Sequence, residues 1–174
     1  MSDFITEKSD QPFIIRIMVN GERCLLETGE KSGQVPPSET LADTLRDRIG
    51  LTGTKISCNH GACGACTVIL DGKPVNSCMI LTVECDGKNI TTIEGLKDRK
   101  TGALDPLQES FVKHTAFQCG FCTPGMIMNA KALLTEKPDA APGDVKEALS
   151  GVFCRCISHY QVIDAVMDVS KYQD

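Results

Sequence analysis

The chain has 174 residues, 41% of them hydrophobic and 24% charged, and a formal net charge of -5. This length allows one domain or two small ones and excludes a large enzyme with a cofactor-binding domain of its own. The negative charge argues against nucleic acid, whose phosphates would be repelled, and the absence of a long apolar run argues against membrane insertion. At the N-terminus, MSDFITEKSDQP (residues 1–12) lacks the basic and apolar regions of a secretory signal, so we expect a tail on a cytoplasmic protein.

Short strands are predicted for the first half of the chain. Residues 13–27 hold two apolar runs separated by Asn20-Gly21, a dipeptide typical of β-hairpin turns. Apolar residues then recur at helical spacing over residues 41–49. Further strands are predicted in CTVIL, MILTVE and ITTI, which begin at residues 66, 79 and 90 and are joined by the turns DGKP and Asp86-Gly87. Strands joined by tight turns, with one helix across them, indicate a small mixed sheet.

The second half reads as helical. From Asp105 onward, four short stretches carry apolar residues at spacings of three and four, and Pro124 sits just inside the start of the second. The polar residues 94–104 between the two halves contain two glycines and are read as a linker. We therefore predict two domains, residues 13–93 and 105–174.

Ten cysteines in a chain with no secretory signal point to metal binding or redox chemistry, because disulfides rarely persist in reducing compartments. One quartet has the spacing C-x4-C-x2-C with a distant fourth cysteine, which is the plant-type [2Fe-2S] arrangement, whereas zinc sites usually use C-x2-C pairs. Gly61 and Gly64 would allow positive φ, so that backbone amides face an anionic cluster. Zinc or free thiols are the alternatives. The quartet consists of Cys58, Cys63, Cys66 and Cys78.

The second quartet is less specific by itself. It reads C-x2-C and then C-x-C, a pattern that zinc also accepts, and a lone C-x-x-C also suits a thiol redox pair. Both pairs precede predicted helices, which begin at Pro124 and Tyr160, and helix N-termini favour an anionic centre. The spacing favours iron-sulfur over zinc and leaves both open. The residues are Cys119, Cys122, Cys154 and Cys156.

Several motifs together resemble the small iron-sulfur subunit of the xanthine oxidase family of molybdenum hydroxylases. They are TGTKISCNHGACGACTVILDGKPVNSC, TTIEGL, LDPLQESFVKHTAFQCGFCTPGMIMNAKALL and ALSGVFCRCISHYQVIDAV, and the resemblance covers about residues 13–167. It implies an α+β fold, with an N-terminal β-grasp [2Fe-2S] ferredoxin-like domain (13–93) followed by an all-α four-helix-bundle [2Fe-2S] domain (105–174). It assigns one [2Fe-2S] cluster to each cysteine quartet.

The resemblance also implies an electron-transfer role without catalytic residues on this chain. In that family a large partner subunit carries molybdopterin, often as its cytosine dinucleotide, and hydroxylates its substrate with water. Electrons pass through the helical-domain cluster and the ferredoxin-like cluster, usually to FAD on a medium subunit, and the complex is expected to be a dimer of heterotrimers. The residue matching Cys156 is hydrogen-bonded to the pterin and the one matching Gln118 lies nearby, so the resemblance makes these two the cofactor-binding residues.

The chain departs from the family pattern around the last cysteine pair. The usual G-N-L-C-R-C-T-G-Y is here GVFCRCISHY, which places Val152, Ile157 and Ser158 at changed positions and inserts His159. Ser57 stands where glycine is common. Residues 28–39 are longer than usual and are read as a surface insertion able to meet a partner.

Other residues receive structural interpretations. His60 and His159 adjoin cysteine ligands, but both quartets are complete without them. The remaining thiols, Cys24 and Cys85, are expected to be inert, and Met126 and Met128 to pack in a core. Two other functions stay open: a free-standing diffusible ferredoxin and a zinc-stapled adapter without a redox role. A subunit, unlike a free carrier, is expected to expose an apolar patch around its helical cluster.

Overall fold

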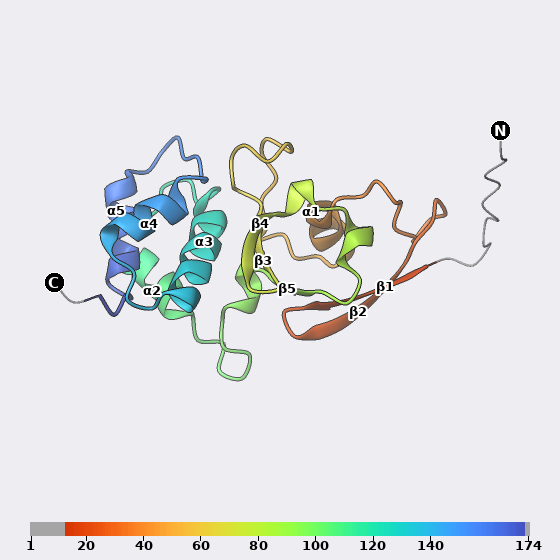
Figure 1. Cartoon of the computed structure of the whole chain (residues 1–174), viewed down its shortest axis with the longest axis horizontal. Coiled ribbons are helices and arrows are strands. Elements are labelled where there is room, and N and C mark those ends of the chain that lie inside the picture. Colours follow the sequence, from red (N-terminus) through yellow and green to blue (C-terminus); the bar gives the residue numbers. More distant parts are fainter. Residues whose placement is uncertain (1–12, 173–174) are drawn as a thin grey trace, which may run out of the picture.

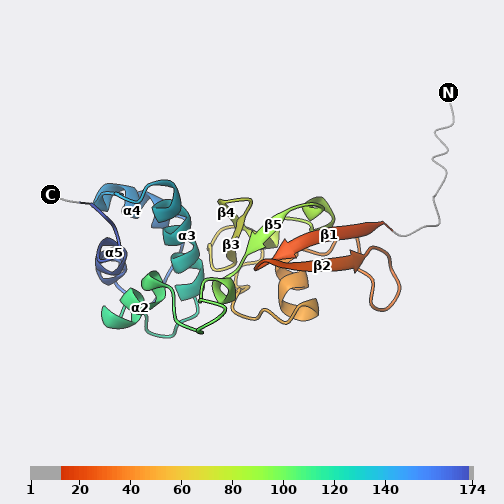
Figure 2. The same ribbon diagram turned by 90° about the horizontal axis from the view of Figure 1, so that it is seen from below.

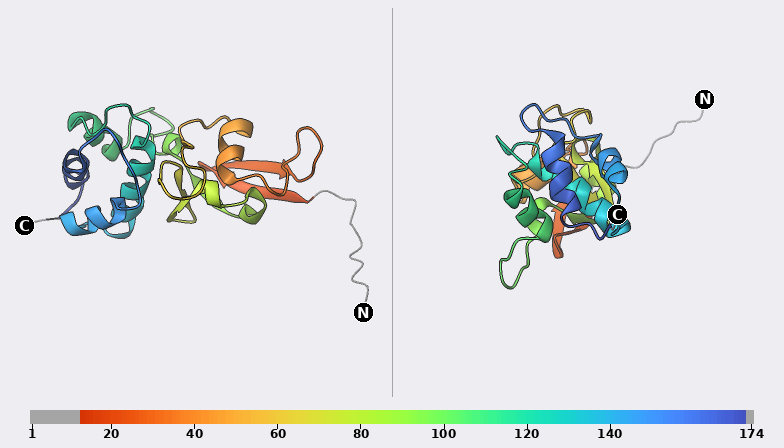
Figure 3. Two further views of the ribbon diagram at one scale, coloured as in Figure 1. Left: turned by 90° about the horizontal axis from the view of Figure 1, so that it is seen from above. Right: turned by 90° about the vertical axis from the view of Figure 1, so that its left-hand side faces the viewer.

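The computed structural model describes residues 13–172 and places a mixed sheet at one end and a group of helices at the other (Figure 1). The predicted tail, residues 1–12, lies outside the described residues. Views from below (Figure 2) and above (Figure 3) show the same division, and α3 (Thr123–Glu136) is the helix next to the sheet. None of the helices in residues 13–172 is long and apolar enough to cross a membrane.

The sheet has five strands in the order β2-β1-β5-β3-β4, in which β1 and β5 are parallel and the other neighbours antiparallel. Both hairpin turns, Asn20-Gly21 and Asp71-Gly72, have positive φ at their two central residues, as such turns require. The prediction of a small mixed sheet with a first hairpin at Asn20-Gly21 is therefore confirmed. The strands are β1 (Ile14–Val19), β2 (Glu22–Glu27), β3 (Thr67–Leu70), β4 (Lys73–Asn76) and β5 (Asn89–Thr91).

One helical segment packs against one face of the sheet. It consists of α1 (Leu41–Asp43) and a π-helical turn (Thr44–Arg48), and it begins where the Thr40 hydroxyl accepts a hydrogen bond from the Asp43 amide. Leu41 and Leu45 are fully buried against alternate residues of β1, including Ile15 and Ile17. The helix predicted over residues 41–49 is thus present, and it supplies the core that a single sheet lacks.

The strand predicted in MILTVE (residues 79–84) is wrong. This segment forms two short 3-10 turns, Ser77–Met79 and Thr82–Cys85, joined by two extended residues, Ile80 and Leu81. Its backbone pairs with the start of α1: the Leu41 amide donates to the Ile80 carbonyl, and the Thr82 amide donates to the Glu39 carbonyl. The apolar run therefore belongs to a loop held by one bridge, and the strand that forms a hairpin with β3 is the segment KPVN of β4.

Four helices follow in the second half: α2 (Pro106–Lys113), α3, α4 (Pro142–Leu149) and α5 (His159–Met167). The first three carry proline in their first turn, where its missing N–H is harmless. Their apolar faces meet in one core that contains Phe111, Met126 and Leu149. The four predicted helical stretches are confirmed, and Met126 and Met128 are both fully buried, as expected of core residues.

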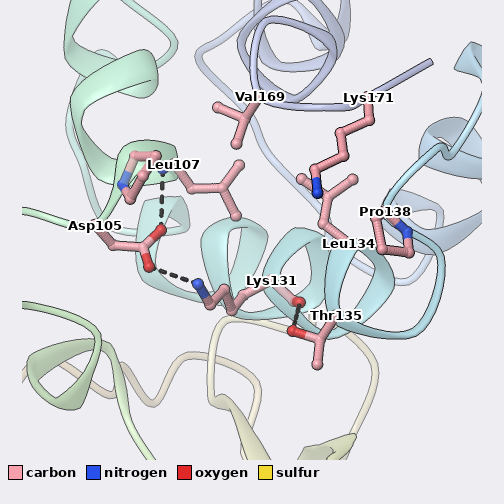
Figure 4. A pocket seen from close by; sticks show the side chains of 9 residues that line it. Asp105, Leu107, Lys131, Leu134, Thr135, Pro138, Val169 and Lys171 are labelled. Carbon is pink, nitrogen blue, oxygen red and sulfur yellow. Dashed lines mark hydrogen bonds and ion pairs between the residues drawn. The ribbon is translucent and has the colours of Figure 1, made fainter.

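The start of α2 is fixed to α3 by a buried carboxylate. As N-cap, the Asp105 carboxylate accepts a hydrogen bond from the Leu107 amide, and the Asp105 amide donates to the side-chain oxygen of Gln108. Lys131 of α3 donates to the second carboxylate oxygen at 2.6 Å (Figure 4). This ion pair orients the first helix of the bundle relative to the helix that follows Cys122.

Candidate iron-sulfur sites

The first cysteine quartet lies on a loop and a hairpin of the sheet. Cys58 and Cys63 belong to the loop before β3, and Cys66 and Cys78 flank the β3–β4 hairpin. Because Thr67 pairs with Asn76 across that hairpin, the two flanking cysteines approach each other, and Ser77 donates to the Cys66 carbonyl from its hydroxyl at 2.7 Å. Sheet register thus joins the distant fourth cysteine to the first three.

Backbone amides surround the sulfur of Cys58. The backbone N–H of His60 contributes most to lowering the pKa of Cys58. Hydrogen bonds from the Cys63 thiol and from the amides of Cys63 and Ala62 add to it, and together they outweigh burial and lower this pKa to about 6. Gly61 and Gly64 adopt φ of 78° and 66°, which confirms the positive φ predicted for them and permits this turn. The loop is therefore preorganised for a thiolate, the form in which cysteine binds metal.

The second quartet lies at the N-termini of two helices. Cys119 and Cys122 precede α3, Cys154 and Cys156 precede α5, and the Cys156 and Cys119 sulfurs lie 3.7 Å apart. The amides of Cys156 and Ile157 each donate to the Cys154 sulfur at 3.4 Å. Although burial acts in the opposite direction, these hydrogen bonds lower the pKa of Cys154, whereas burial raises the pKa of Cys122 to about 12.

The eight thiols contact one another in pairs. The pairs are Cys58–Cys63, Cys66–Cys78, Cys119–Cys156 and Cys122–Cys154. Within residues 13–172, no three His, Cys, Asp or Glu side chains are grouped closely enough to hold a single metal ion. A structural zinc site needs four ligands around one ion, whereas a [2Fe-2S] cluster offers two irons with two protein ligands each.

The sulfur–sulfur distance between Cys119 and Cys156 is that of two ligands on one metal ion. Two thiolates on a tetrahedral metal, at a metal–sulfur distance of about 2.3 Å, lie about 3.8 Å apart. The 3.7 Å between Cys119 and Cys156 matches that value. Each pair of thiols can therefore share one metal ion, and four such pairs fit the four irons of two binuclear clusters.

The two sites face each other across a direct backbone contact. The Phe153 amide donates to the Cys63 carbonyl at 3.0 Å, and a pocket at this junction is lined by cysteines of both quartets. Two exposed aromatic side chains line this pocket beside the helical thiols: Phe121 is 45% and Phe153 67% exposed. Tyr160, in the first turn of α5, is 77% exposed. Exposed apolar side chains were expected next to the helical site, and Phe121 and Phe153 are two such residues.

The remaining candidates lie as follows. Gln118 and Cys156 are both exposed beside the helical site. The His60 ring nitrogen Nδ1 is 2.6 Å from the Cys58 carbonyl, and His159 is the exposed first residue of α5. Cys85 is fully buried, and burial raises its pKa to about 11.

Two of the residues that join the sites were not predicted. Asn129 of α3 and Thr67 of β3 are hydrogen-bonded to each other at 3.1 Å across the junction. Each reads in the sequence as an ordinary polar residue within its element. Both lie within the motifs that carry the family resemblance, but no spacing gives either of them a role.

A ferredoxin-like sheet and a helical bundle, each with four paired thiols, define a protein that carries two iron-sulfur centres. Family models agree: residues 26–92 match the 2Fe-2S iron-sulfur cluster binding domain, and residues 92–167 match the [2Fe-2S] binding domain. The chain is 47% identical over 154 residues to the nicotine 6-hydroxylase small subunit of Paenarthrobacter nicotinovorans, covering 88% of this chain and 87% of that one.

Other relatives extend the likeness. The chain is 37% identical to the aldehyde oxidoreductase iron-sulfur-binding subunit of Escherichia coli (strain K12), over 90% of this chain and 71% of that one. Among solved structures, quinoline 2-oxidoreductase from Pseudomonas putida 86 matches with a TM-score of 0.82 and 42% identity, over 92% of this chain and 93% of that chain.

The chain belongs to the iron-sulfur small subunits of the xanthine oxidase family of molybdenum hydroxylases. It is accordingly an electron-transfer subunit of a molybdenum hydroxylase or dehydrogenase complex, with a large molybdopterin subunit as partner. The free ferredoxin and the zinc adapter are not favoured.

Proposed function

We propose that each cysteine quartet holds one [2Fe-2S] cluster, so that Cys58, Cys63, Cys66 and Cys78 ligate the first and Cys119, Cys122, Cys154 and Cys156 the second. The observation that carries this assignment is the contact of the thiols two by two, with no group of three around a single metal position in the described residues. Such clusters accept and pass on single electrons.

The residues around the thiols would hold negative charge. Backbone N–H groups at Cys58 and Cys154 stabilise thiolates, and the starts of α3 and α5 add the partial positive charge of helix N-termini. These groups are fixed in the fold, so little reorganisation accompanies a change of charge at either site.

We infer that the helical site faces the molybdopterin of the large subunit, carried as its cytosine dinucleotide. Cys156 and Gln118 are exposed next to this site, and we assign them the contacts with the pterin. The aromatic side chains Phe121, Phe153 and Tyr160 supply apolar surface for docking.

At the other end of the relay, we propose an FAD-binding medium subunit beside the ferredoxin-like site, in a dimer of heterotrimers. Support comes from the exposed rim of that site, where His60 is exposed and Met79 is 59% exposed. Met79 directly follows the ligand Cys78, so a partner covering it would lie against the cluster.

The division into a ferredoxin-like domain (13–93), a linker (94–104) and a helical domain (105–174) is likewise our proposal. Two separate cores support it, one around Ile15 and Leu45 and the other around Phe111 and Met126. We place the complex in the cytoplasm, because all ten cysteines are free of disulfides.

The ligand assignment is tested by two substitutions in complex purified through a tag on this chain. Cys63→Ser should remove the ferredoxin-like cluster and Cys122→Ser the helical one, each lowering the iron content from about four to about two per chain. Cys24→Ser is the control and should retain both clusters. Electron paramagnetic resonance (EPR) distinguishes the two signals. Loss of both signals or of neither, or zinc in place of iron, would refute the assignment.

A further inference from the structure

At the junction of the two sites, backbone meets backbone without an intervening side chain. Gly125 lies in the first turn of α3, and a Cβ placed on it would be 2.3 Å from the carbonyl oxygen of Gly64. A Cβ on Gly64 would in turn be 2.4 Å from the Gly151 carbonyl oxygen. Real Cβ atoms essentially never approach so closely. Any other residue at Gly64 or Gly125 would therefore force these backbone segments apart.

Hydrogen bonds from Thr67 and Asn129 connect the Gly64 carbonyl to α3. The Thr67 hydroxyl donates to the Gly64 carbonyl at 2.7 Å, and the Asn129 side-chain amide donates to the Thr67 hydroxyl oxygen at 3.1 Å. The same amide nitrogen also donates to the Gly125 carbonyl at 2.8 Å. One side chain of α3 thus connects both glycines, and Thr67 is buried where it does so.

These contacts lie within a few residues of the cysteines on both sides. Gly64 directly follows Cys63 in the loop before β3, and Gly125 is three residues after Cys122. A shift of the Gly64 carbonyl relative to α3 therefore changes the separation of the two thiol quartets. Electron tunnelling decreases steeply with distance, so a fixed separation has direct consequences for the relay.

We propose that Asn129 and Thr67 are positioning residues, which together with Gly125 lock the Cys63–Cys66 turn against the start of α3 and set the spacing of the two cluster sites. The proposal rests on the ligand assignment given above. It adds that the spacing is controlled by three residues that ligate nothing.

Gly125→Ala is the sharpest perturbation. Gly125 has no positive φ and alanine is the better helix former, so the only cost is the new methyl group. To reach ordinary contact at 3.4 Å from the present 2.3 Å, the Gly64 carbonyl must retreat by about 1.1 Å. Gly143→Ala is the matched control, because Gly143 lies in the first turn of α4 with nothing within 4 Å of its added Cβ.

The readout is the splitting that magnetic interaction between the two reduced clusters produces in the EPR spectrum of the purified complex. Since dipolar interaction falls with the cube of distance, Gly125→Ala should narrow the splitting and Gly143→Ala should leave it unchanged. Thr67→Val and Asn129→Leu should narrow the splitting as well. Thr67→Ser retains the hydroxyl and should keep the splitting at its wild-type value.

Hydrogen exchange of the Phe153 amide gives a second readout that needs no cluster. This amide donates to the Cys63 carbonyl, and loosening the contact should speed its exchange by about five- to tenfold. If a variant binds no iron, the exchange rate of its Phe153 amide is compared with that of iron-free wild-type protein.

The two hypotheses fail in different ways. Wild-type protein without two EPR signals would refute the ligand assignment. Fully loaded variants with unchanged splitting and unchanged exchange would overturn the positioning role and leave the ligands as assigned.

Discussion

The carboxylate of Glu39 anchors the segment that follows Cys78, and its removal should weaken one cluster site selectively. Glu39 accepts two hydrogen bonds from Arg48, each 2.6 Å, and a third from the Thr44 hydroxyl. That hydroxyl lies 2.8 Å from the hydroxyl of Thr82, and the Thr82 amide donates to the Glu39 carbonyl. The network therefore joins the helix on the sheet to the chain leaving Cys78.

The expected cost follows from the geometry. A hydrogen bond to a charged group contributes about 1.5–3 kcal/mol, and solvent lowers this value here because the Arg48 side chain is 26% exposed. We expect Glu39→Gln to lower the free energy of unfolding by about 1 kcal/mol. Glu39→Ala should lower it by about 2–3 kcal/mol, since it also leaves Arg48 and the buried Thr44 without their acceptor.

The same network gives stability a pH dependence of known sign. Burial raises the pKa of Glu39, but the hydrogen bonds from Arg48 and Thr44 outweigh it and leave this pKa below its usual 4.5. A depressed carboxyl pKa contributes stability that is fully present above the unfolded-state value and is lost as the pH falls through the folded-state value. The difference between wild type and Glu39→Gln should therefore shrink below about pH 4.5.

The assay is urea unfolding at pH 7, followed by the EPR signals of the two clusters, with thermal unfolding between pH 7 and pH 3.5 for the acid dependence. The ferredoxin-like signal should disappear at a lower urea concentration in Glu39→Ala, while the helical signal stays at its wild-type midpoint. Glu22→Ala removes an exposed pair with Arg99 and should cost less than about 0.5 kcal/mol. Equal loss of both signals in Glu39→Ala, or an effect no larger than that of Glu22→Ala, would refute the reasoning.

Three further outcomes are expected. Iodoacetamide at pH 8 should label the half-buried Cys24 before Cys85, which is fully buried with a pKa raised by burial to about 11, as peptide mapping of the loaded protein can check. Phe111→Ala, at the centre of the helical core, should cost about 3–5 kcal/mol in urea unfolding, with a cost near zero contradicting that core. Asp105→Ala should cost about 2 kcal/mol and Asp105→Asn about 1 kcal/mol, because asparagine retains the N-cap, and a double-mutant cycle with Lys131→Met isolates the ion pair.

Elements with a local signal were predictable, and those defined by distant partners were not. Asn20-Gly21 and Pro124 specify a hairpin and a helix start through their own backbone preferences. Residues 79–84 form an apolar run that is typical of a strand, yet their hydrogen-bonding partner is the chain near Glu39, about forty residues away. An apolar run does not report which backbone the segment meets, so it does not distinguish a strand from a loop packed on the core.

For the cysteine quartets as well, the sequence predicted the local grouping and not the contacts between distant residues. Spacing identified two groups of four, but it did not identify the pairs within them. Cys119 contacts Cys156 and Cys122 contacts Cys154, so each pair joins one member of C-x2-C to one of C-x-C. Such crossed pairing depends on how α3 and α5 pack, which no spacing encodes.

The departures from the family pattern around the last cysteines are accommodated by packing. Val152 and Ile157, which stand where asparagine and threonine are usual, are 2% and 8% exposed and belong to the helical core. The amide of Ile157 still donates to the Cys154 sulfur, and Val152 also contacts the position where Gly64 would carry a Cβ. Apolar side chains thus suit these two buried positions, and the hydrogen bond to the thiolate needs only the backbone N–H of Ile157. Buried apolar side chains therefore stand at these two positions, and the Cys154 sulfur is held by the backbone N–H groups of Cys156 and Ile157.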